Sequence, residues 1–173
     1  MLQNEVNYVV HCAATVDFRE KLENAMKKNV LGTLQLFDLA KTFKNLIGFV
    51  HVSTAYVNSD RQGFIAEELP PLTFDPEEMV QMVLSMDPAE VEKITPKLIG
   101  NYPNTYTFTK AIAERILEKR RGNIPVSYVR PTIIGASWRE PFAGWIDSVS
   151  AIAAVILYTG VGVVRFIQGR KKF

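Results

Sequence analysis

Stretches rich in β-branched and aromatic residues alternate along the chain with stretches that repeat apolar residues at helical spacing. Residues 6–14, 47–58 and 125–135 have the composition of buried strands that run into turns. Between them, residues 29–41 and 106–121 place apolar side chains three and four positions apart. The order strand, helix, strand, helix, strand is typical of a parallel sheet with crossover helices. The pattern therefore predicts an α/β fold.

A long insertion, residues 58–102, separates the second strand from the second helix. Two Asp-Pro pairs precede short apolar repeats, which predict helices over residues 77–86 and 89–94. Long insertions between core elements often carry function. Its first predicted helix is rich in methionine, and this face either packs in the core or meets an apolar ligand.

Tyr106 and Lys110 stand four positions apart at the start of the second helix, so their side chains share one face. An ammonium beside a phenol stabilises the phenolate, and we therefore expect the pKa of Tyr106 to fall from about 10 towards neutrality. Such a phenol exchanges a proton with a carbonyl or alcohol oxygen. The same spacing also occurs in ordinary helix-surface pairs, so its meaning depends on the neighbouring segments.

The predicted strands end in small and polar residues. Ser53 and Thr54 follow the second strand, where a hydroxyl either joins Tyr106 at a developing oxyanion or only closes a turn. Ala13 and Ala14 follow the first strand and either admit a flat ring or a ribose, or serve helix packing. The single cysteine, Cys12, cannot form an internal disulfide and is expected to be a packed small hydrophobe.

His11 and His51 lie near the ends of two strands that we expect to be neighbours. A metal pair would need a third ligand, and the sequence offers none nearby, so we expect hydrogen-bonded histidines and no metal site. The net charge of +2 is too small to indicate nucleic-acid binding. The hydrophobic share of 47% and the charged share of 22% are those of an ordinary globular domain.

Several segments, taken together, resemble one family. They read HCAATVDF at 11–18, NVLGT at 29–33, HVSTAYVN at 51–58, PNTYTFTK at 103–110, VRPTIIG at 129–135 and EPFAGWID at 140–147. In this order and spacing they resemble the alcohol-forming fatty acyl-CoA reductases, which belong to the extended short-chain dehydrogenase/reductase group. The resemblance covers about residues 5 to 148.

The resemblance implies catalytic roles. Thr54 stands where extended members place the catalytic hydroxyl, and Ser53 is the adjacent alternative. Tyr106 matches the acid/base tyrosine, and Lys110 matches the lysine that binds the nicotinamide ribose, so both also contact the cofactor.

The resemblance also implies the other cofactor contacts and the reaction. Ala13 and Ala14 would line the cofactor, Asn29 would support the hydrogen-bond network, and Pro131 would touch the nicotinamide carboxamide. The implied reaction delivers hydride from NADPH twice, to a long-chain acyl-CoA and then to the aldehyde, with release of coenzyme A and a fatty alcohol. Members associate with membranes of the endoplasmic reticulum or peroxisome.

The family opens with a strand and a glycine-rich turn that receives the pyrophosphate, and no such glycine cluster stands near residue 1. We therefore expect a partial Rossmann-type doubly wound sheet that lacks its first strands and glycine-rich loop. The chain is then a piece of a reductase, a truncated gene model or a shortened isoform, and inactive alone. The preference for NADPH over NADH rests on the resemblance only.

Residues 149–164 form an uncharged apolar stretch, and a basic tail follows up to residue 173. The stretch is shorter than a membrane span, so it either contacts a membrane or forms a buried helix or turn over the substrate pocket. We accordingly divide the chain into a reductase part, 1–148, and an incomplete segment, 149–173.

Two other functions stay open. Another extended reductase, such as a nucleotide-sugar dehydratase or epimerase, would share Thr54, Tyr106 and Lys110 but would not need the residue 103–105 lead-in or the proline-rich insertion. A non-catalytic product would keep this half of the fold as an interaction or regulatory piece, and bound cofactor would exclude it.

Overall fold

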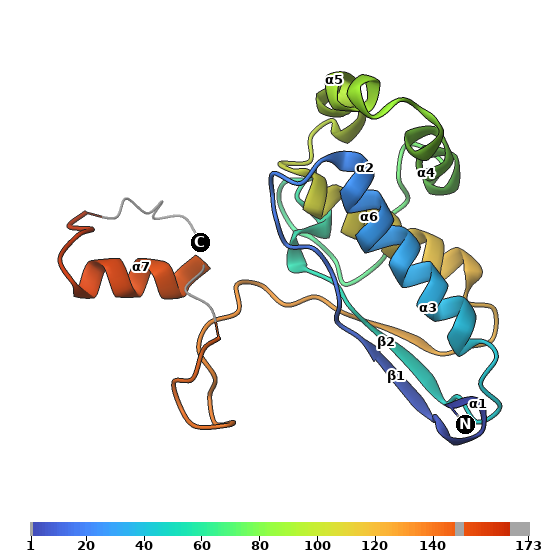
Figure 1. Cartoon of the computed structure of the whole chain (residues 1–173), viewed down its shortest axis with the longest axis horizontal. Coiled ribbons are helices and arrows are strands. Elements are labelled where there is room, and N and C mark those ends of the chain that lie inside the picture. Colours follow the sequence, from blue (N-terminus) through green and yellow to red (C-terminus); the bar gives the residue numbers. More distant parts are fainter. Residues whose placement is uncertain (1, 148–150, 167–173) are drawn as a thin grey trace. The chain divides into compact units, whose positions relative to one another are not determined.

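Three parallel strands form the centre of the molecule. The computed structural model describes residues 2–147 and 151–166. Its strands are β1 (Tyr8–His11), β2 (Gly48–Val52) and β3 (Val126–Val129), in the spatial order β1-β2-β3 (Figure 1). The register pairs His11 with His51, and His51 with Tyr128. The predicted parallel α/β fold is confirmed.

The connection between β1 and β2 is one continuous helix with an irregular turn. It consists of α2 (Leu22–Ala25), a π-helical turn η1 (Met26–Leu31) and α3 (Gly32–Ala40). Ala25 and Leu31, at the two junctions, keep right-handed helical angles, so the chain does not break there. The sequence pattern predicts that this helix starts at Asn29, but the structure starts it at Leu22. The reason is that Leu22 and the following helical turn are buried in the core.

Helix α6 (Thr105–Arg120) connects the insertion to β3 and runs through the core. Asn104 caps it by accepting from the backbone N–H of Thr107 at 2.9 Å, which satisfies a group that the first turn leaves free. Phe108, Ile112 and Leu117 are fully buried along it. The cap and the packing fix the start of α6, where Tyr106 lies.

The insertion holds α4 (Pro76–Ser85) and α5 (Pro88–Ile99). Asp75 and Asp87 cap them, each accepting backbone N–H groups of the first turn, and a proline occupies the first helical position of each. Both predicted helices are confirmed, although α5 continues through Pro96 beyond the predicted end. The remaining short elements are α1 (Leu2–Glu5) and η2 (Ala55–Asn58).

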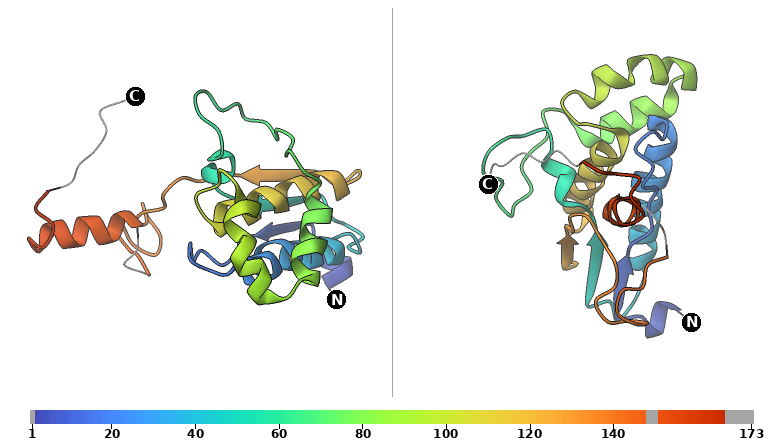
Figure 2. Two further views of the ribbon diagram at one scale, coloured as in Figure 1. Left: turned by 90° about the horizontal axis from the view of Figure 1, so that it is seen from above. Right: turned by 90° about the vertical axis from the view of Figure 1, so that its left-hand side faces the viewer.

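The helices between the strands cover one face of the sheet (Figure 2). Phe49 and His51 point into that face and are fully buried. Side chains that alternate with them, Tyr8, Val10 and Val129, are exposed. Along the described part of the chain, β1 pairs only with β2.

The chain separates into two compact units, residues 1–131 and 132–173. The second contains α7 (Ala151–Gly160), which falls within the apolar stretch. Among the described residues, no helix has both the length and the hydropathy needed to cross a membrane. The expected boundary after residue 148 lies outside the described residues and stays a prediction, as does the placement of this stretch over the substrate pocket.

Candidate active site

Thr54 and Tyr106 meet at the carboxyl end of β2. Thr54 lies in extended backbone just before η2, where its hydroxyl accepts from the N–H of Tyr56 at 3.3 Å. The same hydroxyl lies close enough to the Tyr106 phenol to stabilise the phenolate and so act to lower the pKa of Tyr106. Because parallel strands end at one edge of the sheet, a residue after β2 and the first turn of α6 can lie side by side there.

The pKa of Tyr106 is raised above its ordinary value of 10.0, mainly because the phenol is partly buried. The nearby Thr54 hydroxyl opposes this rise in pKa, and the charge of Cys12 adds to it. The predicted fall of this pKa is therefore wrong for this structure. The physical reason is that the Lys110 ammonium is bonded elsewhere, so burial decides the direction.

Lys110 lies on the same face of α6 as Tyr106, one turn further along. Its side chain is buried, and Nζ donates to the carbonyl oxygen of Val52 at 2.8 Å. Burial lowers the pKa of Lys110 to about 8, while the negative charges of Cys12 and Glu114 oppose this change. A lysine of this kind exchanges protons near neutral pH.

Asn29 lies in the π-helical turn and is fully buried. Its side-chain oxygen accepts from the N–H of Thr15 at 2.9 Å, and its amide donates to the Thr15 carbonyl at 3.2 Å and to the Thr109 hydroxyl at 3.1 Å. It thereby joins the segment after β1 to α6 beside Lys110. The role in the active-site network that the resemblance implies for Asn29 stays a prediction.

Ala13 and Ala14 follow β1 and line a hollow of about 630 Å³ together with His11. The absence of larger side chains leaves this end of the strand accessible to a ligand. Cys12 is exposed at the same strand end, so the predicted packed cysteine is wrong. The reason is that β1 ends at His11, and the chain leaves the helix-covered face there.

Pro131 and Ser53 both lie next to Thr54, Pro131 through its backbone carbonyl and Ser53 as the preceding residue of the chain. The backbone pairing of β2 with β3 continues past the ends of both strands. The backbone N–H of Ser53 donates to the Val129 carbonyl at 2.7 Å, and the backbone N–H of Ala55 donates to the Pro131 carbonyl at 2.9 Å. Pro131 is thus held next to the Thr54 turn. The Ser53 hydroxyl is buried, and the described residues offer it no hydrogen-bond partner.

A buried ion cluster supports α6 behind the site, and the sequence analysis did not identify it. Glu114, one turn beyond Lys110, is fully buried and accepts from Arg130 at 2.7 Å and from Arg115 at 3.0 Å. Arg115 also donates to the Pro70 carbonyl at 3.2 Å, and Arg130 to the Glu68 carbonyl at 3.1 Å. The sequence did hold one sign of this cluster, because Glu114 stands four residues after Lys110 and therefore lies on the same face of the helix.

His11 and His51 are both buried, with their Nδ1 atoms 3.0 Å apart and their rings stacked. The described residues contain no group of three or more His, Cys, Asp or Glu side chains that could hold a metal ion. The hydrogen bond that we expected for these histidines is present between the two rings.

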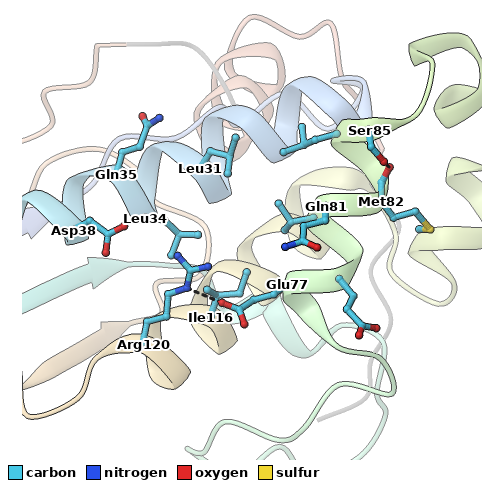
Figure 3. A pocket seen from close by; sticks show the side chains of 13 residues that line it. Leu31, Leu34, Gln35, Asp38, Glu77, Gln81, Met82, Ser85, Ile116 and Arg120 are labelled. Atoms are coloured by element: carbon cyan, nitrogen blue, oxygen red, sulfur yellow. Dashed lines mark hydrogen bonds and ion pairs between the residues drawn. The ribbon is translucent and has the colours of Figure 1, made fainter.

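Another hollow, of about 800 Å³, lies between α3, α4 and α6 (Figure 3). Leu34, Met82 and Ile116 form part of its wall, and Arg120 donates to Glu77 at its edge. Arg120 lies fourteen residues after Tyr106 on α6, a separation of about 21 Å along the helix axis. This hollow is therefore separate from the candidate active site.

Comparison with known proteins identifies the family. The model of the male sterility protein family, an NAD-binding domain, matches residues 1–173. The chain is 46% identical over 163 residues to fatty acyl-CoA reductase 1 of Xenopus laevis and 44% identical over 165 residues to that of Homo sapiens. It is 39% identical over 167 residues to fatty acyl-CoA reductase 2 of Bos taurus.

These matches cover 94–96% of the chain and 32% of each relative, so the chain spans about a third of their length. The predicted resemblance is confirmed.

Solved structures show the same fold at lower identity. The terminal R domain of the myxalamid PKS-NRPS pathway superposes with a TM-score of 0.59 and 23% identity, over 88% of this chain and 32% of that one. UDP-glucuronic acid 4-epimerase of Bacillus cereus, in complex with NAD, has a TM-score of 0.56 and 19% identity, over 91% and 40%. The fold is that of the Rossmann-type NAD-binding reductases and epimerases, and the higher identity to the reductases decides between them. The chain belongs to the fatty acyl-CoA reductase family.

Proposed function

We propose that this protein supplies the catalytic residues for NADPH-dependent reduction of a long-chain acyl-CoA to a fatty alcohol, with release of coenzyme A. The observation that carries the proposal is that the Thr54 hydroxyl lies close enough to the Tyr106 phenol to lower its pKa, with Lys110 one turn further along the same helix. Two hydroxyls at one point form a donor pair suited to a developing oxyanion.

The residues at the strand ends suit a dinucleotide. Small side chains at Ala13 and Ala14 open onto a hollow, while Asn29, Lys110 and Pro131 lie at the same edge of the sheet. Ligands of open α/β sheets bind at this edge. We assign these residues, with Tyr106, to cofactor binding. When bound there, NADPH would supply the hydride for each reduction.

In this proposal, the proton that each reduction consumes is donated by side chains of this protein. Burial raises the pKa of Tyr106, so the phenol is protonated at neutral pH and ready to donate. Thr54 donates to the same oxygen, or to the phenolate after the proton has left. The positive charge of Lys110 nearby limits the energy of that phenolate. Reduction to the alcohol uses this proton transfer in each of the two hydride additions.

The extent of reduction, the cofactor and the substrate are tested together. The protein at its natural length is incubated with palmitoyl-CoA and either NADPH or NADH, and alcohol, aldehyde and free coenzyme A are quantified. We expect alcohol and free coenzyme A, with NADPH preferred over NADH. Turnover of a nucleotide sugar instead of acyl-CoA, or cofactor binding without any reduction, would contradict the proposal.

Association with the membrane of the endoplasmic reticulum or peroxisome is also proposed, from the family alone. Fractionation of cells that express the natural protein tests it, because a membrane-associated reductase sediments with one of those organelles.

A further inference from the structure

Thr54 lies in a stretch of chain that α6 holds from both sides. Before it, the Val52 carbonyl oxygen accepts from the Lys110 ammonium at 2.8 Å. After it, the side-chain oxygen of Asn58 accepts from Nη2 of Arg115 at 3.0 Å. The two donors stand five residues apart on α6, and the two acceptors lie on either side of Thr54. Two bonds from one helix therefore enclose the hydroxyl to which we assign catalysis.

A short 3₁₀ turn connects Thr54 to Asn58. Thr54 is the residue before η2, and Asn58 is its last residue. Within the turn, the Val57 N–H donates to the Thr54 carbonyl at 3.3 Å. At its start, the Ala55 N–H donates to the Pro131 carbonyl at 2.9 Å. A 3₁₀ helix rises about 2 Å per residue, so Asn58 is about 8 Å from Thr54 along the turn. Because the turn is short and internally bonded, a displacement of Asn58 also displaces Thr54.

Arg115 and Asn58 are both shielded from water. The Arg115 side chain is 8% exposed, and Asn58 is 2% exposed. The guanidinium also donates to Glu114 at 3.0 Å and to the Pro70 carbonyl at 3.2 Å. Its planar fork holds these three acceptors in fixed directions. A buried donor that loses its acceptor is left without a partner, so this arrangement opposes movement of η2 away from α6.

The ion cluster around Glu114 has one more positive than negative side chain. Arg115 and Arg130 both pair with this single carboxylate, at 3.0 and 2.7 Å. Their other N–H groups therefore need neutral acceptors, which are backbone carbonyl oxygens and the Asn58 side chain. Arg130 donates to the Glu68 carbonyl but, in the described part of the chain, to no residue of η2. The two arginines thus share Glu114 and differ in their contact with the turn.

We propose that Arg115 and Asn58 are positioning residues, which set the place of the Thr54 hydroxyl beside the Tyr106 phenol. The proposal rests on the proposed function, because that function gives the Thr54 hydroxyl its catalytic role. Arg115 lies nine residues after Tyr106, about 14 Å along the helix axis, so it acts through the turn and not on the substrate. A misplacement of about 1 Å at a reacting centre can cost about 10²-fold in rate.

Asn58→Ala and Arg115→Gln remove the bond from either side. With palmitoyl-CoA and NADPH, we expect kcat of the protein at its natural length to fall about tenfold in each variant. NADPH affinity should stay within about threefold of wild type. Asn58→Asp keeps an acceptor oxygen, so kcat should also stay within about threefold. Wild-type kcat in both N58A and R115Q overturns the proposal, and so does a loss in N58D equal to that in N58A. If R115Q does not fold, N58A and N58D carry the test, because they leave the Glu114 pairs in place.

Combination with Thr54→Val separates positioning from general stability. If Asn58 acts through the Thr54 hydroxyl, N58A should lower kcat about tenfold in the wild type but less than about twofold in T54V, which lacks that hydroxyl. A merely structural residue would lower kcat by the same factor in both backgrounds, and this result would contradict the proposal.

Arg130→Gln is the matched control for this comparison. Arg130 shares with Arg115 the bond to Glu114 and a bond to a carbonyl of the insertion, but it has no bond to Asn58. Whatever its effect on kcat, R130Q should change kcat by the same factor with and without T54V. If its effect also disappears in T54V, the ion cluster as a whole places Thr54, and the assignment to Arg115 and Asn58 is wrong.

Hydrogen exchange tests the turn without activity. The amides of a short surface turn exchange by local opening. By mass spectrometry, peptides that cover residues 54–61 should exchange at least about tenfold faster in N58A and R115Q than in wild type, and at the wild-type rate in N58D. Unchanged exchange in N58A means that the bond does not hold the turn, which refutes the proposal. If the wild type reduces no acyl-CoA, the proposed function fails, and the exchange rates still decide whether Arg115 and Asn58 fix the turn.

Discussion

The ammonium of Lys110 donates to the carbonyl oxygen of Val52 across 2.8 Å. This bond joins the second turn of α6 to the last residue of β2, two residues before Thr54. It therefore fixes the register in which the Tyr106 phenol meets the Thr54 hydroxyl. A buried hydrogen bond from a charged donor is stronger than one between neutral groups. Lys110 thus positions the two residues to which we assign catalysis, in addition to carrying charge.

Replacing Tyr106 by phenylalanine should abolish reduction and leave cofactor binding largely intact. The change removes the proton donor and little else, so we expect kcat to fall about 10²- to 10⁴-fold. NADPH affinity, measured by fluorescence titration, should stay within about threefold. Unchanged turnover in this variant would exclude Tyr106 as the acid.

Thr54→Val and Ser53→Ala decide which hydroxyl is catalytic. The Thr54 hydroxyl lies beside the Tyr106 phenol and acts to lower its pKa, whereas the buried Ser53 hydroxyl has no partner among the described residues. Loss of an oxyanion donor lowers kcat about 10²- to 10³-fold, which we expect for T54V. S53A should retain kcat within about twofold, because it removes no bond. The reverse order of effects would assign catalysis to Ser53.

The alkaline limb of the pH–rate profile should report Lys110. Its pKa is lowered to about 8, while that of Tyr106 is raised above its ordinary value. Reduction needs the protonated forms, so log kcat/KM should be level below pH 8 and fall above it. A limb near pH 10 would instead indicate that the phenol alone titrates.

Lys110→Ala should damage both NADPH affinity and turnover, because the lysine is assigned to the ribose and to the charge beside the phenolate. Lys119→Ala is the matched control on the same helix, since that side chain is exposed and paired with Asp75 and Glu77. It should leave both quantities within about twofold. Normal cofactor affinity in K110A would mean that Lys110 does not reach the ribose.

Two arginines on or beside α6 should differ in their effect on stability. Arg130→Gln leaves the buried Glu114 carboxylate with only Arg115 and should lower the free energy of unfolding by about 3 kcal/mol. Arg120→Gln breaks an exposed pair with Glu77 and should cost less than about 1 kcal/mol. Urea denaturation measures the free energy of unfolding of both variants. An equal decrease in the two would show that the Glu114 cluster stabilises the fold no more than an exposed ion pair does.

Acid should destabilise the wild-type protein through His51. Its pKa is about 3 in the folded state and 6.5 in the unfolded state. Between these values the unfolded chain binds more protons, so stability falls as pH falls from about 6.5 to 3. In His51→Asn this contribution is absent. Denaturation at pH 7 and at pH 4 should therefore show the wild type losing more stability than H51N, by a difference on the order of a few kcal/mol.

Local patterns predicted the elements and much of the site. Strand composition and helical spacing indicated the parallel strands and α6, because side-chain periodicity reflects which face is buried. The Asp-Pro pairs indicated the starts of α4 and α5, since an aspartate cap and a proline at the first helical position act within one turn. The motifs around Thr54, Tyr106 and Lys110 indicated the family, which the comparisons confirm.

Properties that depend on distant segments needed the tertiary structure. The pKa of Tyr106 rises because burial outweighs a lysine that bonds Val52 instead, and helix spacing alone could not reveal that partner. The pairing of His11 with His51 joins residues forty positions apart, and only the register of β1 and β2 decides it. Sequence determined which groups the protein carries and which local elements hold them. Packing of the strands and helices decided which groups meet, because hydrogen bonds and desolvation depend on distances of a few ångströms between remote residues.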